Sequence, residues 1–254
     1  MNLRPLLVLP LLLPTLCLAD TALKYKNKSV PGDAMTIQAR NGDVTMGTRD
    51  SWILVKKGEL KIYVMDGRSK TYMIMDEQTA ERIGQQMDSA QQQMNAMMEQ
   101  QMKNMTEEQK AQLRQMMGDK MPGAVAKNPP KTTVKRLGEE TVAGVTCLNL
   151  MVLLDGKPSG DACVATAGVL SVDPNDYKAM VNATDTMRKI MERMTGKIDN
   201  DAITLNLRAM KGIPIRMRDL VDGEETLLAS RSSAELTPDT FEVPGNFQKR
   251  DIPQ

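Results

Sequence analysis

The chain has 254 residues, of which 41% are hydrophobic and 26% charged, and its formal net charge is +1. This balance gives no electrostatic reason to bind nucleic acid or an anionic membrane. The sequence contains no histidine, which removes the commonest general base, the Ser–His and Cys–His nucleophile pairs and the common zinc sites. We therefore predict a protein that is not an enzyme, with no cofactor and no metal.

Residues 1–19 have the pattern of a secretory signal peptide. Arg4 is their only charge, and an apolar run follows it and ends at the small residue Ala19. The run is too short and too rich in proline to span a bilayer of about 30 Å, and no later stretch reaches the roughly 18 apolar residues of a membrane helix. We expect cleavage before Asp20, a periplasmic location, no transmembrane segment, and a single mature domain, 20–254.

Cys17 supports an alternative N-terminus, because an acylated cysteine is the first residue of a mature lipoprotein. Lipoprotein signals place a small residue before that cysteine, whereas this chain has Leu16 there. We therefore prefer the chain that is soluble after signal cleavage, with the lipidated form as the alternative.

Alternation of apolar and polar residues predicts several strands. In the segment AMTIQAR, Met35, Ile37 and Ala39 share one face. Asp66–Gly67 lies between two alternating runs, which is a strong hairpin signal. Residues 202–220 repeat the pattern: the sequence predicts a strand through Ile203, Leu205 and Leu207, a turn at Lys211–Gly212, a strand from Ile213 to Met217, and a hairpin tip at Asp222–Gly223. Strands of this kind build an antiparallel sheet with one buried side.

Two helical segments are expected to cover that side. The first runs from about Asp76 to Gly118 within a Met/Gln-rich insert, 77–121, and breaks near Asn104, where Thr106 starts a capping box. The second runs from Pro174 to Thr195. Asp173 is its cap, proline stands in its first turn and a glycine follows its end.

The first helix carries a methionine stripe. At about 100° per residue, six of its methionines fall within an arc of roughly 140° that also contains Ile83 and Ala90. They are Met87, Met94, Met97, Met98, Met102 and Met105. Packing explains such a stripe well, because methionine fills irregular gaps. Two alternatives are a Cu(I) site, since thioethers select that ion, and a partner-docking or disordered segment. The candidate ligand or lid face comprises Met87, Met94, Met98 and Met105.

Cys147 and Cys163 form an even pair once the signal peptide has been removed. They flank two strand-like runs that meet at the turn signal DGKP, so a hairpin brings them near each other. The register is about three residues from direct opposition, and a bulge or an asymmetric turn must absorb the difference. We predict a disulfide that contributes about 3 kcal/mol. Free, reactive thiols are the alternative.

Four stretches occur in an order that resembles a bacterial exported family, domain of unknown function 4412. They are Gly138–Val152, Gly160–Met180, Lys211–Glu225 and Phe241–Lys249. Members of that family tend to have an aromatic residue before the first cysteine, where this chain has Val145 and Thr146. The resemblance implies an α+β fold similar to the lipoprotein-localisation carriers, with a curved antiparallel half-barrel whose concave face is covered by amphipathic helices. It implies no activity.

These observations lead to two hypotheses. In the first, the chain is a non-catalytic periplasmic protein that binds or carries a hydrophobic small molecule or lipid, or another amphiphile, in the half-barrel groove. In the second, it is an envelope structural or interaction protein with a filled core. A methionine-rich Cu(I)-binding protein is the lesser alternative to both.

Overall fold

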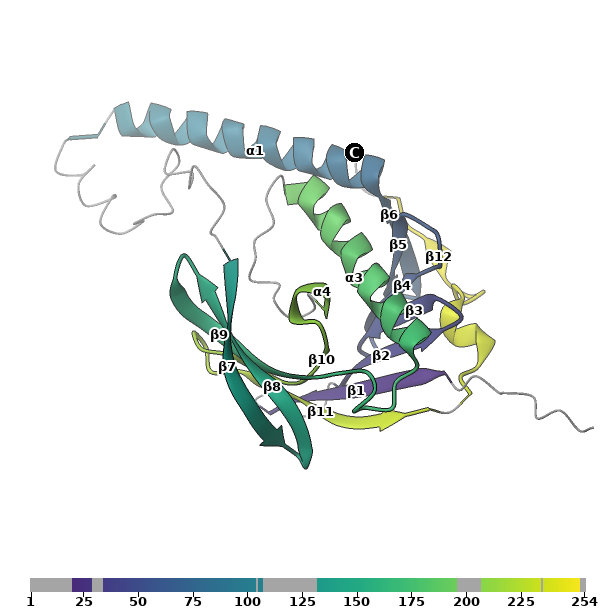
Figure 1. The fold of residues 1–254 in the computed structure, drawn as a ribbon. Helices are drawn as coiled ribbons and strands as arrows, with labels where there is room; N and C mark the ends of the chain where they lie inside the picture. The colour runs from purple at the N-terminus through teal and green to yellow at the C-terminus, as the bar shows by residue number, and fades with distance from the viewer. Residues whose placement is uncertain are drawn as a thin grey trace, which may run out of the picture.

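The structure is a computed structural model that describes residues 20–28, 34–103, 105–106, 132–195, 207–233 and 235–251. Within these ranges the chain has an α+β fold, in which one open, curved sheet of twelve strands accompanies helices (Figure 1). No helix in the described ranges is long and apolar enough to cross a membrane.

The secondary-structure elements have the following bounds. The strands are β1 (Thr21–Asn27), β2 (Ala34–Arg40), β3 (Asp43–Gly47), β4 (Ser51–Val55), β5 (Lys61–Asp66), β6 (Thr71–Asp76), β7 (Thr132–Val142), β8 (Val145–Leu154), β9 (Lys157–Ala165), β10 (Ile213–Asp219), β11 (Glu225–Ser232) and β12 (Gln248–Lys249). The helices are α1 (Glu77–Lys103), α3 (Pro174–Thr195) and α4 (Leu207–Met210), with a 3-10 turn, η3 (Pro238–Phe241).

The sheet consists of two meanders joined in the middle. Its strand order is β12-β6-β5-β4-β3-β2-β1-β11-β10-β9-β8-β7. The pairing of β1 with β11 joins the two meanders, and every neighbouring pair is antiparallel except β12 with β6. The predicted hairpin turns at Asp66–Gly67 and Asp222–Gly223 are confirmed, because they connect β5 to β6 and β10 to β11.

The predicted strand through Ile203, Leu205 and Leu207 is wrong at its last position. Leu207 begins the short helix α4, and the first two positions lie outside the described residues. The residues of α4 include good helix formers. Leu207 and Met210 are both buried, because a three-residue helical step places them on the same side, toward the core. The turn predicted at Lys211 is confirmed by its positive φ of 55°.

Helix α3 covers the concave face of the sheet. It contacts β2, β3 and β5, and Figure 1 shows it lying within the curve of the sheet. Met180, Ala183 and Ile190 from α3 are buried in the main core, together with Ile37 and Val44 from the sheet. The predicted bounds of α3, Pro174–Thr195, are confirmed.

The predicted cap of α3 is also present. Asp173 Oδ1 accepts a 2.7 Å hydrogen bond from the Asn175 N–H. The Asp173 carbonyl accepts the first intrahelical bond, from Tyr177.

Helix α1 does not cover the sheet as expected. It contacts α3 and β6, its buried residues are Ala80 and Gly84, and its distal part extends past the end of α3 (Figure 1). Met87 and Met94 are 54% and 47% exposed, so the packing expected for them is wrong, whereas Met98 and Met105 are half-buried. The reason is steric, since α3 already occupies the concave surface.

The C-terminal segment covers part of the opposite face of the sheet. Leu54 and Met65 point to that face, where they pack with Phe241 from η3 in a second buried cluster. The rings of Trp52 and Phe247 meet edge to face with centroids 5.6 Å apart. The concave and convex sides of this meander therefore have separate apolar cores.

The contact between α1 and α3 yields a first prediction. A Cβ at Gly84 would lie 2.7 Å from the Met194 carbonyl oxygen and 3.0 Å from that of Arg193. At a solvent-exposed position inside a helix, Gly→Ala stabilises the folded protein by up to about 1 kcal/mol. At this site the added Cβ would force the backbones of α1 and α3 apart. Gly84→Ala should therefore lower the free energy of unfolding by about 1–3 kcal/mol, as measured in a denaturant titration.

Gly168→Ala is the matched control, because a Cβ at Gly168 has no heavy atom within 4 Å. Equal stability of Gly84→Ala and the parent chain would contradict the close helix crossing.

Candidate functional site

A cleft of about 780 Å³ lies along one side of α3. Its opposite wall consists of the β2–β3 turn at Asn41–Gly42 and the β4–β5 connection from Lys56 to Leu60. Arg208 of α4 lines it as well. The cleft therefore opens at the border of the concave face, where the helix meets the strand turns.

Part of the inner surface of the cleft is apolar. Val55, Ala179 and Ala183 are buried lining residues. Leu60 also lines the cleft and is 62% exposed, although leucine is usually buried. Hydrocarbon placed against these four side chains would bury apolar surface, at about 25 cal/mol per Å².

Cations surround this apolar patch. Lys57, Lys178 and Lys189 line the cleft and are exposed, and within the described ranges none of the three forms a salt bridge. Two other cations of the cleft are neutralised: Lys56 lies 2.6 Å from Glu242, and Arg208 donates to Asp185 at 2.7 Å. The side chains available to an incoming anion are thus the three lysines.

One end of the cleft is acidic. Asp20, Asp173 and Asp176 line it, and Asp20 and Asp176 are buried. Desolvation raises the pKa of the Asp176 carboxyl, although hydrogen bonds from Thr21 act in the opposite direction. In the described part of the chain no set of three or more Asp, Glu, Cys or His side chains is arranged to hold a metal ion.

The methionines of the predicted ligand face lie elsewhere. Met87, Met94, Met98 and Met105 are not among the residues that line this cleft. Their role as a ligand or lid face stays a prediction. The lysines of the cleft were missed from the sequence, although Lys178 and Lys189 belong to the polar stripe of α3, opposite its apolar one.

The predicted disulfide is present between Cys147 and Cys163, whose Cα atoms are 5.4 Å apart. Cys163 on β9 pairs with Asn149, two positions along β8 from Cys147, so the bridge is diagonal. The expected irregularity is a shift in register between Val152 and Leu153. Both cysteines are buried, which favours a structural bond over a reactive one.

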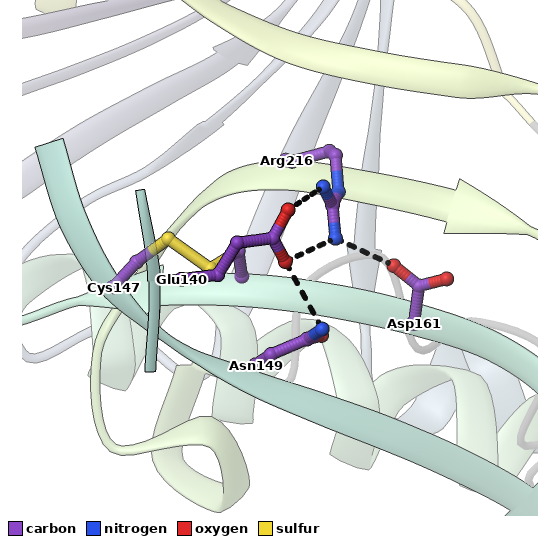
Figure 2. The surroundings of a disulfide bond; sticks show 6 residues. Glu140, Cys147, Asn149, Asp161 and Arg216 are labelled. Atoms are coloured by element: carbon purple, nitrogen blue, oxygen red, sulfur yellow. Dashed lines mark hydrogen bonds and ion pairs between the residues drawn. A yellow bond between two sulfur atoms is a disulfide. The ribbon is translucent and has the colours of Figure 1, made fainter. Parts of the chain in front are cut away.

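An ion-pair network lies beside the disulfide (Figure 2). Glu140 of β7 accepts two hydrogen bonds from the Arg216 guanidinium of β10, at 2.5 and 2.9 Å. Arg216 also donates to Asp161 at 3.2 Å, and Arg218 donates to the other Asp161 oxygen at 2.8 Å. Asn149 Nδ2 donates to Glu140 at 3.0 Å. The network ties β7 to β10 across the two strands between them.

The electrostatics of the network indicate a structural role. Hydrogen bonding to Arg216 lowers the pKa of Glu140 and raises that of Arg216, so both groups stay ionised. Bidentate Arg–carboxylate pairs of this kind are among the stronger charge-assisted contacts. The network was not predicted from the sequence. The available signal was the pair Arg216 and Arg218, which are two residues apart on a strand and therefore on one face.

Comparisons with known proteins yield a remote likeness of shape. No family model matches the chain, and no curated protein matches it. An uncharacterised conserved protein from Thermus thermophilus aligns with a TM-score of 0.42 and 6% identity, over 92% of this chain and 91% of that one. PNGF-II aligns with a TM-score of 0.41 and 6% identity, over 92% of this chain and 32% of that one.

A second prediction concerns the pH dependence of the network. The lowered pKa of Glu140 means that its stabilisation is present above the unfolded-state pKa of about 4.3 and is lost as the pH falls through the folded-state value. Glu140→Gln should therefore lower the thermal midpoint near neutral pH and lose this effect in acid. Thermal scans across a pH series measure both.

The neighbouring Glu139→Gln is the control, because Glu139 is exposed and belongs to the same strand. A difference between Glu140→Gln and the parent chain that persists unchanged in acid would refute the ionic role of Glu140.

Proposed function

We propose that the chain is an exported, non-catalytic binding protein that holds an anionic amphiphile in the cleft beside α3. The observation that carries this proposal is a group of three lysines, Lys57, Lys178 and Lys189, around the exposed Leu60. None of the three forms a salt bridge with another described residue. Apolar walls with a few well-placed polar groups are typical of ligand sites.

The two parts of such a ligand match the two parts of the cleft. An acyl chain fits against Val55, Ala179 and Ala183. The anionic head then lies among the lysines, whose flexible stems and compact charges accept anions without demanding one geometry. The chemistry of the lysines suits fatty acids and other amphiphiles with a carboxylate or phosphate head.

Export to the periplasm and a half-barrel architecture belong to the same proposal. The signal-like segment 1–19, the disulfide and the resemblance to the exported family support export. The curved sheet with α3 inside it supports a half-barrel similar to that of the lipoprotein-localisation carriers, which hold acyl chains in their concavity.

Binding of a fluorescent fatty acid tests the proposal. Titration of the exported chain should give saturable binding, and a triple variant, Lys57→Ser with Lys178→Ser and Lys189→Ser, should bind about tenfold more weakly or worse, at roughly 0.5 kcal/mol per lysine. Raising the salt concentration should weaken the parent and leave the triple variant nearly unchanged.

Lys24→Ser is the matched control, because Lys24 is an exposed lysine on β1 that does not line the cleft. Absence of saturable binding by the parent, or equal binding by the triple variant, would refute the amphiphile proposal.

A second candidate function is docking of a protein partner through α1. The observation that favours it is the exposure of Met87, Met94 and Met97 on a helix whose buried residues lie near its start. Exposed methionines suit adaptable interaction surfaces. A photo-crosslinking residue at Met97 should then capture one discrete partner in the cell.

The same crosslinker at the exposed Glu99 is the control, since it lies outside the methionine arc. Capture of the same products from both positions, or of none from either, would count against docking through this face.

A further inference from the structure

The carboxylate of Asp176 is incompletely satisfied. Asp176 belongs to the first turn of α3 and is only 7% exposed, and its Oδ2 atom is buried without a hydrogen-bond partner in the described part of the chain. A buried carboxylate oxygen without a partner is costly, so such atoms are usually paired in folded proteins. Asp176 lines the acidic end of the cleft. The Asp176 carboxylate could therefore accept one more hydrogen bond, and a positively charged donor would suit it best.

The charged groups near Asp176 add to the cost of leaving this carboxylate without a cationic donor. In addition to desolvation, the negative charges of Asp173 and Asp20 raise the pKa of the Asp176 carboxyl, whereas the side chain and backbone of Thr21 lower it. The Arg40 guanidinium is directed to Asp20, whose carboxylate lies 3.7 Å from it. A donor with a positive charge would relieve both the missing hydrogen bond and the repulsion among the three carboxylates.

The position of Asp20 identifies that donor. Asp20 and Asp176 line the same end of the cleft. Successive backbone nitrogens are at most about 3.7 Å apart, so the Asp20 nitrogen lies within one such step of the Thr21 nitrogen, which acts on the Asp176 carboxyl to lower its pKa. Asp20 is itself held in place: it is 8% exposed, and its Oδ2 accepts a 2.7 Å hydrogen bond from the Leu236 N–H.

We infer that cleavage before Asp20 creates a terminal ammonium that binds the free oxygen of Asp176 and fastens β1 to α3. Hydrolysis of the Ala19–Asp20 peptide bond consumes one water. The carboxylate departs with the leader, and the neutral amide nitrogen becomes an amine that takes up a proton. One donor without charge is thereby replaced by three donors with a positive charge. The inference rests on the export step of the proposed function.

The consequence is that processing completes the fold. Among the described residues, one oxygen of the Asp176 carboxylate is buried and has no hydrogen-bond partner. After removal of the leader, the charge pair joins the first strand of the mature chain to the helix that covers the concave face. A chain with extra residues before Asp20 should fold and be measurably less stable.

A double-mutant cycle tests the ammonium pair. Four mature chains are compared by thermal unfolding near neutral pH: one that starts at Asp20, one with Ala-Ala added before Asp20, and the Asp176→Asn form of each. We expect the addition to lower the midpoint by about 5 °C when Asp176 is present and by less than about 1 °C in the Asp176→Asn pair. Equal losses in both pairs overturn the inference.

Asp185→Asn is the control on the same helix and in the same cleft, and the full loss from the added residues should persist in it. Because the cycle compares differences, a change in stability caused by Asp176→Asn alone does not affect the outcome. Mass spectrometry of the exported chain supplies a second readout: a mature chain that starts at Asp20 supports the inference, and any other start overturns it.

Fluorescent fatty acid binding by the same chains separates the two proposals. If the double-mutant cycle shows coupling between the terminal amine and Asp176 but the chains do not bind the probe, this inference is supported and the amphiphile proposal is refuted. Probe binding without coupling refutes this inference alone.

Discussion

The burial of α3 against the concave face is the interaction on which the other features depend. Met180, Ala183 and Ile190 fill the curve of the sheet, and the sheet alone would expose an apolar surface to water. Three other features of the structure lie on or against this helix. The cleft lies along its polar side, α1 attaches at its last turn through Gly84, and Asp176 in its first turn lines the acidic end of that cleft.

Local patterns predicted the elements whose form is set by neighbouring residues. The hairpin turns at Asp66–Gly67 and Asp222–Gly223 depend on short-range turn chemistry, and the bounds of α3 depend on Asp173, on the following proline and on a periodic apolar stripe. The disulfide followed from an even cysteine count in a hairpin. Each of these features can be derived from a window of about twenty residues or fewer.

Features that depend on competition between segments could not be predicted in the same way. The stripes of α1 and α3 have similar periodicity, and the sequence does not say which helix occupies the one concave surface. Leu207 fits both a strand and a short helix, and burial beside Tyr177 selects the helix. The Glu140–Arg216 network joins residues that are 76 positions apart. The cleft required α3 and two strand turns to be placed together before its lysines formed a group.

Hydrogen exchange of the two long helices tests the central claim most directly. If α3 is the cover of the concave face, its amides from Met180 to Ile190 should exchange only through global unfolding, while those of α1 beyond Met87 should exchange much faster through local opening. We expect this contrast in the free protein. Protection of distal α1 equal to that of α3, or rapid exchange throughout α3, would contradict it.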